Sequence, residues 1–205
     1  QAERALACGM EVLAEIADKG LDVVATGDMG IGNTTASSAI VAVMTGLPAA
    51  RVTGRGTGLD DEGLARKIQV IEQAIAVNQP DPNDAMDVLC KVGGLEIAGL
   101  AGVMIAAAAR RIPVAVDGFI STAAAMIGVG LVPDLRHYLF GAHRSVEIGH
   151  RAMHRHLGLA PLLNLSLRLG EGTGAALAFH LMEAACRILR EMATFEEAGV
   201  SGKGL

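Results

Sequence analysis

The sequence predicts an α/β fold, a Rossmann-like three-layer domain in which a mostly parallel sheet packs between Ala- and Gly-rich helices. Short runs of β-branched residues alternate with longer Ala-rich segments, which is the pattern of βαβ units around a parallel sheet. The 205 residues are also 51% hydrophobic but only 2% aromatic. Small side chains must therefore fill the core, so helices and sheet have to approach each other closely. We expect one ordered α/β domain over residues 1–205.

The expected elements alternate along the chain. The first helix should end before Gly20, because glycine is typical of the positions just after a helix. Asp60 and Asp61 favour a helix start, and Arg110 and Arg111 favour a helix end. Acidic side chains are stabilised at the positive N-terminal end of the helix dipole and basic ones at the negative C-terminal end. The predicted helices are 1–19, 34–44, 60–76, 95–111, 121–127, 145–156 and 173–192, and the predicted strands are 21–26, 112–116, 138–142 and 162–167.

Charge and cysteine content exclude several classes of protein. The net charge is −5 and no basic cluster is interleaved with aromatic residues, so we expect no nucleic-acid partner. The longest uncharged runs, 34–50 and 119–132, are short or broken by Ser, Thr and Gly, which favours buried helices over membrane spans. Cys8, Cys90 and Cys186 lack the spacing of a zinc ribbon or a disulfide framework, which favours the reducing cytoplasm. No signal peptide is visible, although the absence of an initial Met leaves the true start open.

Glycine is in excess and is concentrated in loops. The chain has 26 glycines, whereas an average usage of about 7% would give roughly 14. Nine of them form three alternating clusters, at 27–32, 54–58 and 170–174. Two of these clusters follow a predicted strand and precede a predicted helix, where backbone N–H groups and the helix N-terminus can bind phosphate. A tight turn without a ligand is the alternative for any one cluster, but three clusters in one chain favour binding.

The common nucleotide-binding motifs do not account for these loops. Thr35 stands where the last glycine of G-x-G-x-x-G would be, and the chain has no G-K-[ST] of a P-loop. Asp60 and Asp61 superficially resemble the acidic pair of enzymes that bind Mg²⁺ and phosphoribosyl pyrophosphate. That pair would end a hydrophobic strand, whereas this one follows a Gly/Thr loop. We therefore favour a charged helix start at this position.

Two acidic residues stand at promising places. Glu171 lies between two glycines, after an apolar run and before the long helix 173–192. In an apolar crevice it would be a candidate general base, whereas the helix N-terminus would make it a weaker proton acceptor, and the sequence leaves both open. Asp117 and Gly118 follow the strand 112–116, at the edge where parallel sheets form ligand crevices. A turn in which Asp117 caps the next helix is the alternative.

The histidines suggest a metal site but do not support one well. Glu147, His150 and His154 are spaced to share one face of the predicted helix 145–156. The H-E-x-x-H pattern is absent and neighbouring arginines make the segment cationic. We favour a solvated helix face and predict no metal.

Five segments together resemble the nicotinate-nucleotide:dimethylbenzimidazole phosphoribosyltransferases. They are G-D-M-G-I-G-N-T-T (27–35), V-T-G-R-G-T-G (52–58), V-A-V-D-G-F (114–119), G-A-H-R-S (141–145) and R-L-G-E-G-T-G-A (168–175). The set occurs in the family's order and covers nearly the whole chain. The resemblance begins inside the family's sequence, so this chain is similar to its C-terminal larger part. It implies a small helical subdomain that lies partly outside the chain and shares the C-terminal helix.

The resemblance also implies an activity. Enzymes of this family transfer phosphoribose from nicotinate mononucleotide to 5,6-dimethylbenzimidazole, with inversion at C1′. The products are nicotinate and α-ribazole 5′-phosphate, which supplies the lower ligand of cobalamin. The family is homodimeric and uses neither a metal nor another cofactor. Small-molecule substrates and a homodimer are therefore the expected partners.

Residue by residue, the resemblance implies a site. Glu171 matches the proton acceptor, and Met29 and Leu169 resemble apolar walls of the base pocket. Asp28 stands where many members have Glu, so the charge is kept on a shorter side chain. The other residues that resemble substrate-binding positions are Gly30, Gly56, Lys67, Asp117, Gly118, Ser145 and Arg168. From the sequence alone, Lys67 is equally consistent with a solvated helix lysine beside Arg66.

Two other classes of function remain as alternatives. One is a non-catalytic α/β nucleotide-binding or sensor protein that keeps the phosphate loops without turnover. The other is an oligomeric scaffold in which glycine serves only packing. Glu171 favours the enzyme over the sensor, because a pure binder needs no acid beside the glycosidic carbon of its ligand.

Overall fold

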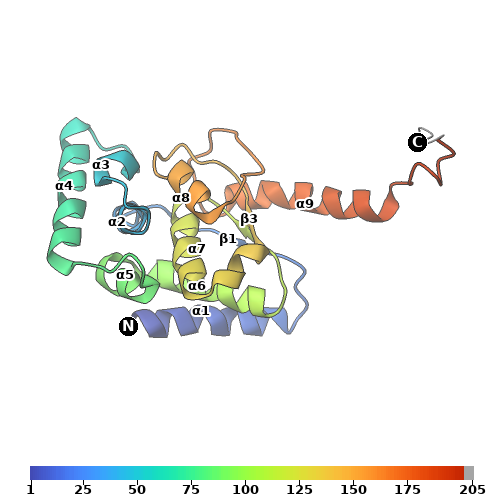
Figure 1. Cartoon of the computed structure of the whole chain (residues 1–205), viewed down its shortest axis with the longest axis horizontal. Helices are drawn as coiled ribbons and strands as arrows, with labels where there is room; N and C mark the ends of the chain where they lie inside the picture. Colours follow the sequence, from blue (N-terminus) through green and yellow to red (C-terminus); the bar gives the residue numbers. More distant parts are fainter. Residues whose placement is uncertain (201–205) are drawn as a thin grey trace.

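The computed structural model describes residues 1–200 as an α/β body from which the last long helix projects (Figure 1). In this described part of the chain, three short strands are inserted between longer helical segments. The elements are α1 (Ala2–Ala17), β1 (Val24–Thr26), α2 (Thr34–Thr45), α3 (Ala49–Val52), α4 (Asp61–Asn78), α5 (Ala85–Val92), α6 (Leu95–Ala109), β2 (Val114–Val116), α7 (Phe119–Leu131), the 3-10 helix η1 (Pro133–Tyr138), β3 (Leu139–Gly141), α8 (His150–Leu157) and α9 (Thr173–Glu191).

The described strands form one parallel sheet, as the sequence predicts. Its order is β1-β2-β3, and Val114 of the central strand pairs with Val24 on one side and with Leu139 on the other. Parallel pairing requires crossover connections, and here these are the helical segments α2–α6 and α7–η1. All three strands consequently end at the same edge of the sheet, where the loops after them meet.

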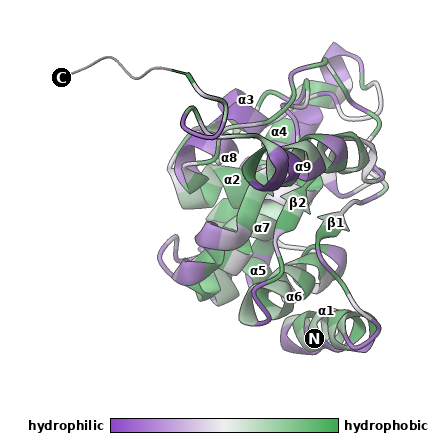
Figure 2. Ribbon diagram, turned by 90° about the vertical axis from the view of Figure 1, so that its right-hand side faces the viewer, coloured by the Kyte–Doolittle hydropathy of each residue, from purple (hydrophilic) through white to green (hydrophobic). Residues whose placement is uncertain are grey.

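Helices cover both faces of the central strand. Val114 and Val116 pack into the large core with α6 and α7, whereas Ala115 packs into a smaller cluster with Ala175 and Ala178 of α9. This division follows from the strand itself, because successive side chains point to opposite faces. Figure 2 shows α7, most of which is buried, as largely hydrophobic. The three-layer order of helix, sheet and helix is therefore present.

Small residues allow the helices to approach closely. A Cβ on Gly9 of α1 would collide with the Gly99 carbonyl oxygen of α6, and a Cβ on Gly102 would collide with the Leu6 carbonyl oxygen. Both helices thus meet backbone to backbone, which a larger side chain at either glycine would prevent. Part of the glycine excess serves helix packing rather than the loops.

Most predicted elements are present, but two predictions are wrong. Residues 162–167 form no strand: Leu163 makes a single bridge to His143, and Ser166 adopts a left-handed conformation with φ 55° that interrupts extended backbone. The helix predicted over 145–156 begins only at His150, because the preceding segment forms a loop. The short elements α3, α5 and η1 were not predicted.

Helix termini agree well with the sequence. Asp60 is the N-cap of α4, since its Oδ1 accepts a hydrogen bond from Gly63 N at 2.8 Å, so the charged helix start is confirmed. Gly20 follows α1 with a φ of 95°. Within residues 1–200, none of the helices combines the length and apolar character that crossing a bilayer requires.

Candidate active site

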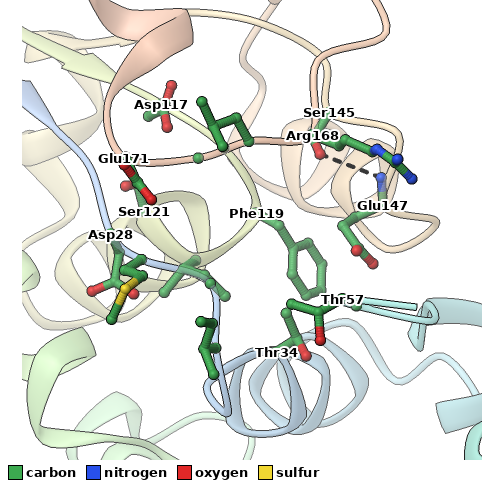
Figure 3. Close-up of a pocket in the computed structure, with 18 of the residues that line it drawn as sticks. Asp28, Thr34, Thr57, Asp117, Phe119, Ser121, Ser145, Glu147, Arg168 and Glu171 are labelled. Atoms are coloured by element: carbon green, nitrogen blue, oxygen red, sulfur yellow. Dashed lines mark hydrogen bonds between the residues drawn. The ribbon is translucent and has the colours of Figure 1, made fainter. Parts of the chain in front are cut away.

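The loops after the three parallel strands line a cavity of about 520 Å³, together with the segments before α4 and before α9 (Figure 3). The loop after β1 contributes Asp28–Ile31, the loop after β2 contributes Asp117 and Gly118, and the loop after β3 contributes Ser145. The carboxyl edge of a parallel sheet is where α/β folds bind ligands. The predicted site therefore lies where the topology would place a small-molecule site.

Ten of the eleven residues predicted from the sequence line this cavity. They are Asp28, Met29, Gly30, Gly56, Asp117, Gly118, Ser145, Arg168, Leu169 and Glu171. Two ends can be distinguished. The Lys67 end comprises Thr34, Gly56, Lys67, Ser145 and Glu147, and the Glu171 end comprises Asp28, Met29, Leu169 and Glu171. In Figure 3, Asp28 and Glu171 lie on one side of the cavity, and Thr34, Ser145 and Glu147 on the other.

Glu171 has a strained backbone. Its φ is 58°, and the flanking Gly170 and Gly172 have φ values of 79° and 80°. A side chain in this left-handed region costs about 1–2 kcal/mol, and such strain is typical of functional sites. The Glu171 N–H donates to the Asp28 carbonyl oxygen at 3.0 Å, which ties this loop to the loop after β1. The side chain itself is exposed at the cavity rather than enclosed in an apolar crevice.

Apolar surface and a second acid accompany Glu171. Met29 is 62% exposed and Leu169 is 65% exposed, so this end offers two large apolar side chains to a ligand. The Asp28 carboxylate accepts a hydrogen bond from the Asn33 amide. Partial burial, together with the charge of Glu96, raises the pKa of Asp28, and the Asn33 hydrogen bond opposes this. The Glu171 end therefore combines exposed apolar walls with two carboxylates.

Asp117 holds α9 in place. Its side chain is 1% exposed, Oδ2 accepts from Gly172 N and Oδ1 accepts from Ala175 N, both at 3.1 Å. These are N–H groups that a helix N-terminus leaves unsatisfied. The alternative that Asp117 caps the next helix is thus wrong, because it caps α9 instead of α7. Its carboxylate fixes Gly172, the residue after Glu171.

Lys67 lies in the interior. Its side chain is 9% exposed, and its Nζ donates to Thr34 Oγ1 at 2.7 Å and to the Gly54 carbonyl oxygen at 3.2 Å. The interpretation as a solvated helix lysine is therefore wrong. Lys67 lies behind the cavity wall, since a Cβ on Gly56 would be 3.6 Å from Nζ. Burial lowers the pKa of Lys67, and the Glu147 carboxylate opposes this shift.

The expected solvated histidine face is also wrong. His150 and His154 are buried, and their ring centroids are 4.3 Å apart. Glu147 belongs to the loop before α8, so it does not share a helix face with them. Among residues 1–200, no group of three His, Cys, Asp or Glu side chains has an arrangement that could hold a metal ion.

A family model described as phosphoribosyltransferase matches residues 1–200. The chain belongs to the nicotinate-nucleotide:dimethylbenzimidazole phosphoribosyltransferase family. Proteins of that name from Roseiflexus sp. (strain RS-1) and Geobacter sulfurreducens are 64% and 59% identical to it over 99% and 98% of this chain. The chain spans 58% and 57% of the length of these two relatives.

Solved structures support the family assignment. The crystal structure of CobT from Thermus thermophilus has a TM-score of 0.92 and 47% sequence identity, and it covers 99% of this chain. This chain in turn covers 60% of the Thermus chain. The α/β fold of this chain is therefore shared with an experimentally determined relative.

Sequence reasoning missed Glu147 and Thr34. Glu147 is half-buried, and burial raises its pKa while the Lys67 charge opposes the shift. Its carboxylate packs so closely on Gly54 that a Cβ there would collide with it. Thr34 connects the N-terminus of α2 to Lys67. One signal in the sequence could have identified Glu147 as a site residue, namely its position two residues after Ser145, between a strand and a helix. The spacing of Glu147 with His150 and His154 suggested a metal site instead and obscured this signal.

Proposed function

We propose that the protein transfers the phosphoribosyl group of nicotinate mononucleotide to 5,6-dimethylbenzimidazole, giving α-ribazole 5′-phosphate and nicotinate. The observation that carries this proposal is the convergence of ten predicted site residues on one cavity at the carboxyl edge of the sheet. The relatives carry this activity in their names. Because the chain spans only part of their length, the activity is assigned to the complete gene product.

The Lys67 end suits the phosphate of the donor. Backbone at Gly56 can approach an anion closely, because no side chain intervenes. Two of the three Lys67 ammonium hydrogens are used by Thr34 and Gly54, which leaves one N–H for an anion beside Gly56. The Ser145 hydroxyl, which accepts from Glu147 N at 3.3 Å, keeps its own O–H for donation. This end would therefore bind and orient the ribose phosphate.

The Glu171 end suits the acceptor. A flat aromatic base fits between exposed apolar side chains such as Met29 and Leu169. A lone pair on one ring nitrogen of dimethylbenzimidazole attacks C1′ from the face opposite nicotinate. The electrons of the breaking C1′–N bond return to the nicotinate ring, and the benzimidazole N–H proton passes to the Glu171 carboxylate. Attack from the opposite face converts the β configuration to α.

One carboxylate base is sufficient for this reaction. The donor carries nicotinate as a pyridinium, which leaves as a neutral ring nitrogen and therefore needs no general acid. Glycosidases have poorer leaving groups and use a pair of carboxylates. Asp28 would contribute negative charge near C1′ and the benzimidazole ring, and it would not take part in proton transfer.

The reaction is tested by mixing the complete gene product with nicotinate mononucleotide and dimethylbenzimidazole and following nicotinate by chromatography. We expect nicotinate release that depends on the benzimidazole and yields a product with α configuration by NMR. Binding of nicotinate mononucleotide without release would contradict the proposal and favour a sensor. Release without dimethylbenzimidazole would indicate hydrolysis instead of transfer.

We further propose that the enzyme is a cytoplasmic homodimer whose α/β domain spans residues 1–205. Support for the reducing compartment comes from three exposed, free cysteines. Support for an additional packing partner comes from α9, which projects from the body (Figure 1) and leaves Leu189 88% exposed. Sharing of α9 with a small helical subdomain fits the same observation. Sedimentation of the complete gene product tests the dimer, and a monomer at micromolar concentration would contradict it.

A further inference from the structure

Three buried histidines form a cluster at the cavity: His143 lines its wall, and His150 and His154 lie behind. The ring centroids of His143 and His150 are 6.1 Å apart, and those of His150 and His154 are 4.3 Å apart. Within the described residues, the ring nitrogens of His143 and His154 form no hydrogen bond, and the nearest charged group to His143 Nε2 is Asp117 Oδ1 at 3.4 Å. His150 differs because both of its nitrogens are engaged. This difference distinguishes it from a histidine that only fills space.

The two contacts of His150 define its tautomer. Ser145 N–H donates to Nδ1 at 2.9 Å, so Nδ1 carries no proton. In a neutral imidazole the proton is then on Nε2, which lies 2.8 Å from Thr122 Oγ1. Thr122 in turn donates its hydroxyl proton to the Gly118 carbonyl oxygen at 2.8 Å. The result is a directed chain from Ser145 through His150 and Thr122 to Gly118.

This chain joins two walls of the cavity that are remote in sequence. Gly118 follows β2 and Ser145 lies in the loop after β3, and both line the cavity. His150 and Thr122 are both 0% exposed. Water therefore could not replace their hydrogen bonds if either side chain were changed. The Ser145 loop is also held by hydrogen bonds from Arg144 N to the Leu163 carbonyl oxygen at 2.8 Å and from Val146 N to the Leu167 carbonyl oxygen at 3.2 Å, but neither bond reaches the Gly118 loop. One imidazole therefore sets the spacing between the two loops.

We propose that His150 is a positioning residue that holds Ser145 and Gly118 in the geometry needed to bind the ribose phosphate of the donor. The proposal rests on the proposed function, since it assigns these two loops to nicotinate mononucleotide. His150 does not touch the substrate. It acts through the Ser145 backbone and through Thr122, so its loss should weaken donor binding more than the chemical step.

Shape alone does not explain the residue. A leucine at position 150 would fill similar space, but it would leave the Ser145 N–H without an acceptor and the Thr122 hydroxyl with only its bond to the Gly118 carbonyl oxygen. Conservative substitutions separate the two contacts. In H150N the amide oxygen can still accept from Ser145 N, and in H150Q the amide nitrogen can still donate to Thr122. T122V cuts the Thr122 contact while preserving side-chain volume.

The test measures KM for nicotinate mononucleotide, KM for dimethylbenzimidazole and kcat in the complete gene product. For H150L we expect the donor KM to rise about tenfold, the scale of one buried hydrogen bond. H150N, H150Q and T122V should each give a smaller rise. The KM for dimethylbenzimidazole and kcat should stay within about twofold of the unmodified protein in all four variants. Unchanged donor KM in H150L would overturn the proposal.

Two controls on the same helix separate positioning from stability. His156 is exposed on α8, so H156N should leave the donor KM unchanged. Met153 is fully buried on α8, so M153A destabilises the helix without touching the hydrogen-bond chain. If M153A raised the donor KM as much as H150L, the effect would be one of stability, and the proposal would be wrong.

A measurement on the unmodified protein covers the case in which H150L does not fold. Histidine ¹⁵N chemical shifts should show His150 with its proton on Nε2, and a proton on Nδ1 would overturn the chain of hydrogen bonds. If the unmodified protein released no nicotinate, the proposed function would fail separately. The positioning role of His150 would then be tested by calorimetry, which measures the affinity of H150N and T122V for nicotinate mononucleotide. Unchanged affinity in both variants would contradict that role.

Discussion

The two ends of the cavity are built differently. At the Lys67 end the polar groups are already partnered inside the protein: Lys67 is 9% exposed, and Thr34 and Gly54 hold its ammonium group. At the Glu171 end the carboxylate and the apolar side chains Met29 and Leu169 are exposed. The first end is pre-organised for a charged group, whereas the second presents surface that a flat ligand would cover. Binding and proton transfer are thus assigned to different ends, and substitutions should affect them separately.

The largest effect is expected for Glu171→Gln. The amide cannot accept the benzimidazole proton, so turnover should fall by about 10² or more, the scale of a lost general base. Affinity for nicotinate mononucleotide should remain within about twofold, because the donor phosphate binds at the other end. Nicotinate release and calorimetry measure the two quantities. Near-normal turnover in the variant would refute the assignment of Glu171 as the base.

The next effect is expected for Lys67→Ala. Loss of the ammonium group removes a charge-assisted hydrogen bond to phosphate, which should weaken nicotinate mononucleotide binding by about tenfold or more. Turnover at saturating donor should change much less. Arg66→Ala is the matched control, since Arg66 is exposed and pairs only with Glu62 among residues 1–200. Equal affinities of the two variants in calorimetry would show that Lys67 does not serve the donor.

A smaller effect concerns the pH dependence of stability. Burial, with the nearby His154 and His143, lowers the pKa of His150 well below its ordinary value of 6.5. The unfolded chain therefore binds a proton that the native protein excludes, so His150 contributes stability above about pH 6.5 that is lost as the pH falls toward its native pKa. Raised pKa values at Asp28 and Glu147 act in the opposite direction, around and above their ordinary range.

Chemical denaturation at several pH values measures this contribution. The free energy of unfolding should fall between pH 6.5 and pH 5 by up to about 1.4 kcal/mol per pH unit for one proton. In H150N the slope should be shallower, and the difference between the two proteins isolates His150 from the other groups. Parallel curves would contradict a buried neutral imidazole at this position.

The smallest effect is expected away from both ends. Asp60→Ala removes the N-cap contact to Gly63 N and should lower the free energy of unfolding by about 1 kcal/mol. Donor affinity and turnover should not change, because Asp60 does not line the cavity. A loss of either would mean that the start of α4 is coupled to Lys67 on the same helix. Thermal unfolding with the nicotinate assay distinguishes the two outcomes.

The sequence by itself determined the features that depend on local chemistry. Alternating β-branched and Ala-rich segments predicted a parallel sheet, and three described strands form one. Asp60 predicted a helix start because an N-cap needs a contact only three residues away. The sequence singled out Glu171 because it lies between two glycines, and residues 170–172 do have φ angles of 58–80°, a conformation that glycine adopts without a steric cost.

Only the tertiary structure decided which polar groups meet. Asp117 caps α9 across 55 and 58 residues, Lys67 bonds to Thr34 across 33 residues, and His150 meets Thr122 across 28 residues. The hydrophobic periodicity of a sequence does not predict pairs so far apart in the chain. They form because the order of the strands in the sheet brings distant loops to one edge. The burial of Lys67, which the sequence left open, and of His150, which the sequence placed on a solvated helix face, follows from the same packing.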